Sequence, residues 1–364
     1  DWSPDVCSSD LVKVVYLNYN VSAGYSKDTF NIAFKANGLS DAFVQPVNIS
    51  SKGFPVNVSF SGKETNSTYH VDVKNMVPGS MYASVTAYPN VVSDLMKGVE
   101  SILREPGGCF EQTSMSSYPN IMVMDYLKAT DTKDDQLMAR ADKLIDNGYH
   151  KLVTFETKSK GYEWFGSSPG HEALTAYGLM QFNDMKNVYA GVDQKMIDRT
   201  ADWLLARRDG DGGYKRDAKA LDSFGRASKE VTDCYITYAL TSAGYKDLQR
   251  EVDHMYKVAM DKKDPYMLGL AANGLFKFNR DHRAENALDE LLKQQKEDGS
   301  FAGKEMSITC SGGQALSIET TSLAVCAMLQ SDKVDNGALT KSVDFLVKSR
   351  SGYGSFGKIG RAHV

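Results

Sequence analysis

The chain contains few of the features that mark membrane, nucleic-acid-binding or metal-binding proteins. No apolar run reaches the length of about 18 residues that a membrane-spanning helix needs. Lysine and arginine number 42 against 46 aspartates and glutamates, and no basic run occurs, so we expect neither nucleic acid nor an anionic membrane as a partner. The five cysteines and six histidines show no spacing typical of zinc, and we expect no metal and no cofactor.

Both ends of the chain resemble translated sequencing adapter. Residues 1–11 lack the alternation of the segment that follows them, and residues 359–364 end the chain abruptly after a glycine-rich turn. We therefore expect both ends to be extraneous, and the remaining segment to be internal to a longer protein.

Residues 12–91 alternate apolar and polar side chains in short runs, which lie at 12–16, 30–34, 56–60, 69–73 and 83–87. Turn residues such as Pro78 and Gly79 separate these runs. The pattern predicts a small segment of antiparallel β structure.

Residues 92–358 have a helical pattern instead. A first helix is predicted at 93–103, and inner helices rich in small and apolar residues are predicted at 173–182, 235–243, 267–276 and 320–329. The stretch 197–205 is amphipathic and should lie outside. Glycine-aromatic turns recur at Tyr162, Tyr214, Phe301 and Phe356. Alternating buried and amphipathic helices with a hairpin-scale period predict a mainly α fold, an α/α toroid preceded by the small β segment.

The pentapeptide Gly108-Cys109-Phe110-Glu111-Gln112 carries the chemistry. Side chains three residues apart are neighbours on a helical turn, so the Cys109 sulfur can reach the Gln112 γ-carbonyl, displace ammonia and form an internal thioester. The pKa of a free thiol is about 8.5, so the sulfur leaves more easily than an amide nitrogen and the bond is an acylating agent. Packing must hide it from water, and we expect Phe110 and the apolar run 121–124 to form part of this shield. The alternative is a structural cysteine beside an exposed glutamine in a helix cap.

Two blocks of sequence resemble the thioester-containing domain of the alpha-2-macroglobulin family, whose members include protease-trapping macroglobulins, complement proteins and bacterial macroglobulin-like proteins. The first is LREPGGCFEQT at 103–113, continued by YPNI at 118–121 and DYL at 125–127. The second is WFG at 164–166 followed by PGHEALTAYGL at 169–179, which is similar to the next inner helix of the bacterial-type domain.

The resemblance implies a domain organisation. Residues 12–91 would be the N-terminal half of a CUB-like domain, and residues 92–358 a toroid that has six hairpins when complete. We expect an incomplete ring here, with exposed apolar surface at the gap.

The resemblance also implies a function. The protein would be a secreted, periplasmic or cell-surface endopeptidase inhibitor of innate defence rather than an enzyme. After activation, its thioester would acylate lysines of an attacking protease, and the remaining macroglobulin domains of the parent chain would be further partners.

His171, Glu172 and Asp222 are candidates for a place near the thioester. In some complement proteins a downstream histidine steers the bond towards hydroxyls, but its counterpart here falls near Asp222, and no histidine occurs between His171 and His254. The resemblance therefore implies direct reaction with amines. His171 is either a proton acceptor or nucleophile near the motif, or a helix-start hydrogen-bond acceptor. Glu111 is expected to support the local turn, and Gly108 and Phe110 to support the bond.

Two other functions remain open. One is an α/α-toroid enzyme: a prenyltransferase or cyclase with Asp233, Cys234 and a third ligand such as His282 on zinc, or a carbohydrate-active enzyme with Glu172 and Asp222 as its acid/base pair. The chain has no aspartate-rich diphosphate motif. The other is a complement-like opsonin that labels surface hydroxyls, for which the assisting histidine is missing.

Overall fold

The computed structural model describes residues 26–49, 66–77, 79–85, 102–217, 227–333 and 335–349, together with 16, 54, 56, 58, 60 and 87. The chain divides into two compact units, a β unit that contains both strands and a helical unit that contains every described helix. Within these described ranges, no helix combines the length and the apolar character that crossing a lipid bilayer requires.

The β unit contains one antiparallel hairpin, formed by β1 (Ser26–Ala36) and β2 (Leu39–Ile49), which pair along their whole length. Asn37 and Gly38 connect the strands with φ angles of 48° and 83°, the conformation that a two-residue hairpin turn requires. The run predicted at 30–34 lies in β1 and is confirmed. β2 was not predicted, although an Asn-Gly pair between two alternating runs is its sequence signal.

Other predicted strands are wrong or lie outside the described residues. Residues 69–73 and 83–85 form no strand, and the side chains of Tyr69, Val71 and Val73 are 47–49% exposed. Strands are stabilised by packing of side chains between neighbouring strands, and these side chains are largely exposed. The runs at 12–16 and 56–60 lie mostly outside the described residues.

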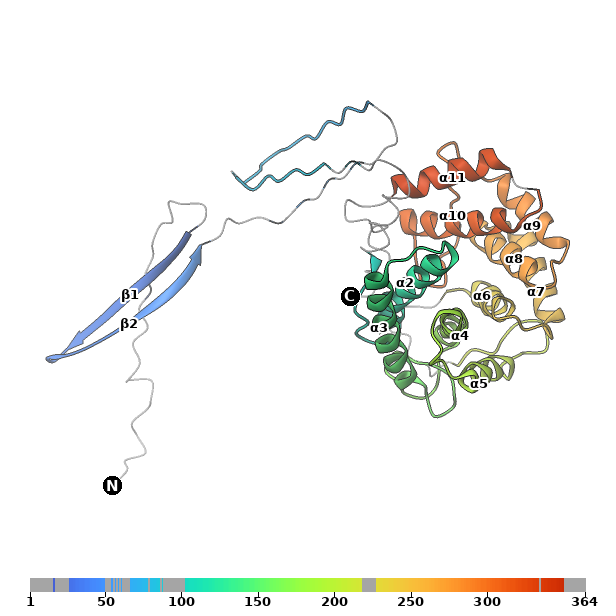
Figure 1. Ribbon diagram of the computed structural model, residues 1–364, viewed down its shortest axis with the longest axis horizontal. Helices are drawn as coiled ribbons and strands as arrows, with labels where there is room; N and C mark the ends of the chain where they lie inside the picture. The colour runs from blue at the N-terminus through green and yellow to red at the C-terminus, as the bar shows by residue number, and fades with distance from the viewer. Residues whose placement is uncertain are drawn as a thin grey trace, which may run out of the picture. The chain divides into compact units, whose positions relative to one another are not determined.

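The helical unit is built from successive hairpins. Their helices are α2 (Phe110–Ala129) with α3 (Asp135–Leu152), α4 (Glu172–Val188) with α5 (Gln194–Leu205), α6 (Lys229–Ser242) with α7 (Gln249–Lys262), α8 (Pro265–Lys277) with α9 (Arg283–Leu292), and α10 (Gly313–Gln330) with α11 (Asn336–Lys348). A short 3-10 helix, η2 (Val153–Phe155), follows α3. The first helix of each hairpin packs against the first helix of the next, so an inner layer lies within an outer one (Figure 1). The predicted mainly α fold and toroid arrangement are confirmed.

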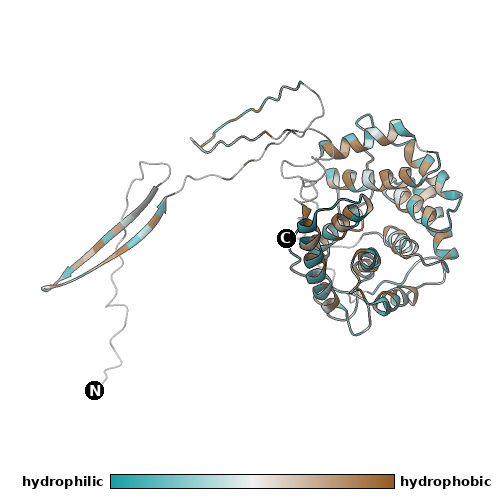
Figure 2. Ribbon diagram, in the orientation of Figure 1, coloured by the Kyte–Doolittle hydropathy of each residue, from teal (hydrophilic) through white to brown (hydrophobic). Residues whose placement is uncertain are grey.

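The composition of each helix explains its layer. Every residue of α8 from Pro265 to Phe276 is buried, as predicted for the inner helix at 267–276. By contrast, α5 buries one face that includes Ile197, Trp203 and Leu204, as predicted for an outer helix. The outer helices alternate hydrophilic and hydrophobic residues along their length (Figure 2).

The glycine-aromatic turns fix the loops that precede three inner helices. Their aromatic side chains are fully buried. The backbone N–H of each aromatic residue donates to a side chain on the inner helix that follows: Tyr162 to Thr175 Oγ1 at 2.8 Å, Tyr214 to Asp233 Oδ1 at 3.1 Å, and Phe301 to Thr321 Oγ1 at 3.0 Å. Each loop is thereby tied to the helix that it precedes. The turn at Phe356 lies outside the described residues.

The inner helices at the two ends of this packed series expose apolar side chains. Met122 on α2 is 65% exposed and Leu329 on α10 is 64% exposed. Within the series, by contrast, the inner helix α8 is buried along nearly its whole length. Both edges of the series therefore leave apolar surface uncovered by the described residues.

Candidate functional site

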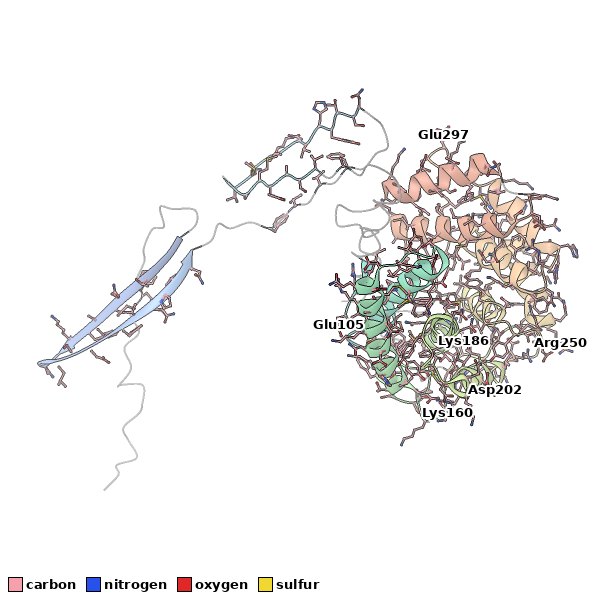
Figure 3. All side chains as sticks on the ribbon, in the orientation of Figure 1. Glu105, Lys160, Lys186, Asp202, Arg250 and Glu297 are labelled. Carbon is pink, nitrogen blue, oxygen red and sulfur yellow. The ribbon has the colours of Figure 1, made fainter. Side chains whose placement is uncertain are left out.

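The segment that leads into the motif is held against the first hairpin. Asn120 on α2 accepts a hydrogen bond from the Arg104 backbone N–H at 3.0 Å and donates to the Arg104 carbonyl at 2.9 Å. Glu105 lies at the edge of the helical unit in Figure 3 and accepts from Asn147 on α3 at 2.9 Å. The predicted helix at 93–103 falls outside the described residues except for Ile102 and Leu103. These bonds fix the path of the chain immediately before Cys109.

Cys109 is the N-cap residue of α2, with an extended backbone at φ −74° and ψ −179°. Gly108 before it has φ +87°, in the left-handed region that favours glycine. The Thr113 hydroxyl donates to the Gly108 carbonyl at 3.3 Å, and the Thr113 N–H donates to the Cys109 carbonyl at 2.8 Å. The thiol thus lies at the start of a helix, and the turn before it is held by hydrogen bonds from Thr113.

The Gln112 side chain folds back over this turn. Its Oε1 accepts from the Cys109 backbone N–H at 3.3 Å. A Cβ atom at Gly108 would lie 2.0 Å from Gln112 Oε1 and 2.9 Å from Gln112 Cδ, so the carboxamide occupies space that only glycine leaves open. The amide carbon is therefore brought back towards the residue that carries the thiol, as thioester formation requires.

The residues expected to shield the motif lie mostly in the core of the helical unit. Phe110 is fully buried and packs below the motif, with its ring 5.0 Å from Tyr162 and 6.1 Å from Phe155, centroid to centroid. In the run 121–124, Met122 is exposed and the other three side chains are buried in the core. A helix rises about 1.5 Å per residue, so this run starts about 18 Å along α2 from Cys109 and cannot cover it. Cys109 itself is half-buried and Gln112 is exposed.

Trp164, from the loop before α4, makes two hydrogen bonds to the first turn of α2. Its carbonyl accepts from the Phe110 N–H at 2.9 Å, and its indole Nε1–H donates to Glu111 Oε2 at 2.9 Å. Glu111 thus contacts the loop rather than only its own helix. No role in the site was predicted for Trp164, because the contact joins residues 53 positions apart and no local spacing encodes it.

His171 and Glu172 begin α4 near this loop. His171 is the N-cap residue, its Nδ1 accepts from the Leu174 N–H at 3.4 Å, and its ring lies 4.8 Å from the Trp164 ring. The helix-start hydrogen bond is thus the interaction that its Nδ1 makes, and it occupies the lone pair that a base would use. Glu172 is 2% exposed and pairs with Arg207 at 3.1 Å. Asp222 lies outside the described residues.

The residues named for a zinc-dependent enzyme are engaged elsewhere. Asp233 bonds to Lys229 Nζ at 2.7 Å, Cys234 is fully buried, and the His282 side chain is 89% exposed beside Asp281. Among the residues that the structure describes, no group of three or more histidine, cysteine or acidic side chains is placed to hold a metal ion.

Cys234 should resist thiol reagents in the folded protein, whereas the same thiol should react after unfolding. Its side chain is fully buried on α6, and burial raises the pKa of the thiol, which suppresses the reactive thiolate. Iodoacetamide labelling followed by peptide mass spectrometry, with and without denaturant, measures this difference. Labelling of Cys234 at equal rates in both states would contradict the prediction.

Comparison with known proteins places this geometry in context. A family model described as A-macroglobulin TED domain matches residues 83–360. The chain is 23% identical over 312 residues to thioester-containing protein 1 allele S1 of Anopheles gambiae, which covers 83% of this chain and 22% of that protein. It is 25% identical over 303 residues to ovostatin of Gallus gallus, covering 78% of this chain and 20% of that protein.

A third relative shares a shorter stretch at higher identity. Alpha-2-macroglobulin-like protein 1 of Mus musculus is 30% identical over 151 residues, which is 41% of this chain and 10% of that protein. The chain therefore spans at most about a fifth of the length of these relatives.

Proposed function

The chain belongs to the alpha-2-macroglobulin family, and from this premise we propose that its helical unit carries an internal thioester that traps attacking proteases covalently. The observation that carries the proposal is the position of the Gln112 carboxamide, which is folded back onto Cys109 N over the space left by Gly108.

The chemistry proceeds in two steps. In the first, Cys109 Sγ attacks Gln112 Cδ, a carbon–sulfur bond forms, and the amide nitrogen leaves as ammonia with the thiol proton. In the second, the Nζ of a target lysine attacks the same carbon, the carbon–sulfur bond breaks, and the Cys109 sulfur leaves as a thiol with the proton from the amine. The product is an amide between position 112 and the target.

The acceptor proposed is an amine rather than a hydroxyl. A hydroxyl needs a base to take its proton, and the Nδ1 of His171, the histidine of the α4 N-terminus, is occupied by the Leu174 N–H. A lysine held beside the thioester needs less assistance, since effective molarities of well-placed groups reach ~10⁵ M or more.

The thioester also needs a cover until activation. Gln112 is exposed and Cys109 half-buried in the helical unit, so the cover is proposed to come from other macroglobulin domains of the parent chain. The β hairpin is proposed to belong to a CUB-like domain beside the helical unit in sequence. We place the parent protein outside the cytoplasm, as a component of defence against foreign proteases.

Methylamine tests the proposed function in the native full-length protein. Treatment should convert Gln112 into its methylamide and release one thiol at Cys109, both visible by peptide mass spectrometry, whereas glycerol at equal concentration should leave the bond intact. A free Cys109 thiol and an unmodified Gln112 amide in freshly isolated protein would refute the thioester. Preferential glycerol ester formation at position 112 would instead favour surface labelling through hydroxyls.

A further inference from the structure

The first turn of α2 is capped by the two residues that would react with each other. A helix N-terminus leaves backbone N–H groups without partners, and serine, threonine, aspartate or asparagine at the N-cap usually satisfies one of them. Here Cys109 and Gln112 form a reciprocal capping box, in which the Cys109 side chain accepts from the Gln112 backbone N–H and the Gln112 side chain accepts from the Cys109 backbone N–H. Sulfur is a weak acceptor, and thioester formation engages both side chains of this cap. The chemistry therefore draws on the groups that would ordinarily hold the turn.

The loop before α4 supplies a support that is independent of the two reacting side chains, through Trp164. Its carbonyl accepts from the N–H of Phe110, the first helical residue, and its indole N–H holds the carboxylate of Glu111, the second. Phe110 and Glu111 stand between the two reacting residues, Cys109 and Gln112. Fixing the two central residues from outside the helix fixes the separation and direction of the two reacting side chains.

The loop is itself rigidly held, so Trp164 can act as a fixed support. The buried carboxylate of Glu163 accepts from the backbone N–H groups of Phe165 at 2.8 Å and Ser167 at 3.0 Å. Gly161 and Gly170 at the two ends of the loop lie against the Trp203 ring on α5, where Cβ atoms would come within 2.5 and 3.0 Å of it. The loop is thus anchored both to its own acidic side chain and to the outer layer.

We propose that Trp164 is a positioning residue for the thioester, holding the Cys109–Gln112 turn in bond-forming geometry through its hydrogen bonds to Phe110 and Glu111. This inference rests on the proposed thioester function. The indole contact is the part that substitution can remove, since Trp164→Phe keeps a ring beside His171 and keeps the backbone carbonyl, but has no N–H for Glu111. Glu111→Gln keeps an acceptor oxygen for the indole, and Glu111→Leu removes it.

The test is a double-mutant cycle in the native full-length protein. The measured quantities are the fraction of chains that carry a closed thioester, from thiol titration before and after methylamine, the half-life of the bond in buffer, and the thermal midpoint. Trp164→Phe and Glu111→Leu should each lower the closed fraction or the half-life several-fold. The double variant should be no worse than Glu111→Leu alone, because Glu111→Leu has already removed the hydrogen bond that Trp164→Phe removes. Glu111→Gln should stay close to wild type.

Trp203→Phe is the matched control, since it makes the same change at a tryptophan that contacts the loop but not the motif. It should leave the closed fraction and the half-life unchanged even if it lowers the thermal midpoint. Equal losses in Trp203→Phe and Trp164→Phe would overturn the proposal, because loosening of the loop would then explain both. A wild-type closed fraction and half-life in Trp164→Phe would also overturn it.

If Trp164→Phe does not fold, the comparison of Glu111→Leu with Glu111→Gln decides. Loss of the bond in the leucine variant alone supports the proposal, and wild-type behaviour of both overturns it. The wild-type methylamine reaction separates this result from the proposed function: no methylamide at Gln112 refutes the thioester itself, whereas a methylamide with insensitive variants refutes only the role of Trp164.

Discussion

Replacing Gly108 with alanine should lower the fraction of chains that carry the thioester by about ten-fold or more. The φ angle of +87° costs a residue with a Cβ atom about 1–2 kcal/mol, and a ten-fold loss corresponds to about 1.4 kcal/mol. The new Cβ would also lie 2.0 Å from Gln112 Oε1 and 2.8 Å from Gln112 Cβ. The carboxamide can swing away, but the Gln112 Cβ is fixed to the helix, so the acyl group would be displaced from the Cys109 end of the turn.

Gly107→Ala is the matched control for this prediction. Gly107 is the neighbouring glycine, and a Cβ there would meet nothing within 4 Å. Thiol titration with and without methylamine in the native full-length protein measures both variants. A closed fraction in Gly108→Ala equal to that in Gly107→Ala would show that the position of the Gln112 side chain is not required for the bond.

The sequence predicted those features that depend on local spacing. The three-residue separation of Cys109 and Gln112 predicted that their side chains share one helical turn, and the Gln112 amide does lie back over that turn. The alternation of buried and amphipathic helices predicted the layers of the toroid, because a helix that is apolar on most sides can only be stable inside. The inner helix α8 and the outer helix α5 follow this rule.

The features that the sequence did not predict depend on contacts between distant residues. Glu111 contacts Trp164 across 53 positions, and nothing in the spacing of either block indicates that bond. The packing of Phe110 also depends on distant residues: a large apolar residue beside a reactive bond suggests a cover, but the direction of its ring depends on where the neighbouring helices leave space. That space is provided by Gly178 on α4, where a Cβ would lie 2.9 Å from Phe110 Cζ.

Replacing Phe110 with alanine should lower the free energy of unfolding of the helical unit by about 3–5 kcal/mol, the usual cost of truncating a buried aromatic side chain. The Phe110 ring is fully buried between Phe155 and Tyr162, and Gly178 leaves room for it, so its truncation would leave a cavity in the core. Chemical denaturation followed by far-UV circular dichroism measures the change, with an unaltered dependence on denaturant if the same surface is exposed.

Phe165→Ala separates core packing from proximity to the motif. Phe165 lies beside Trp164 in the loop before α4, but its side chain is 69% exposed, so its truncation should change the free energy of unfolding by no more than about 0.5 kcal/mol. If Phe110→Ala is as mild as Phe165→Ala, the Phe110 ring does not anchor the motif in the core. A large loss confined to Phe110→Ala would mean that packing of Phe110 in the toroid core anchors the reactive pentapeptide, while Cys109 and Gln112 stay accessible at the surface.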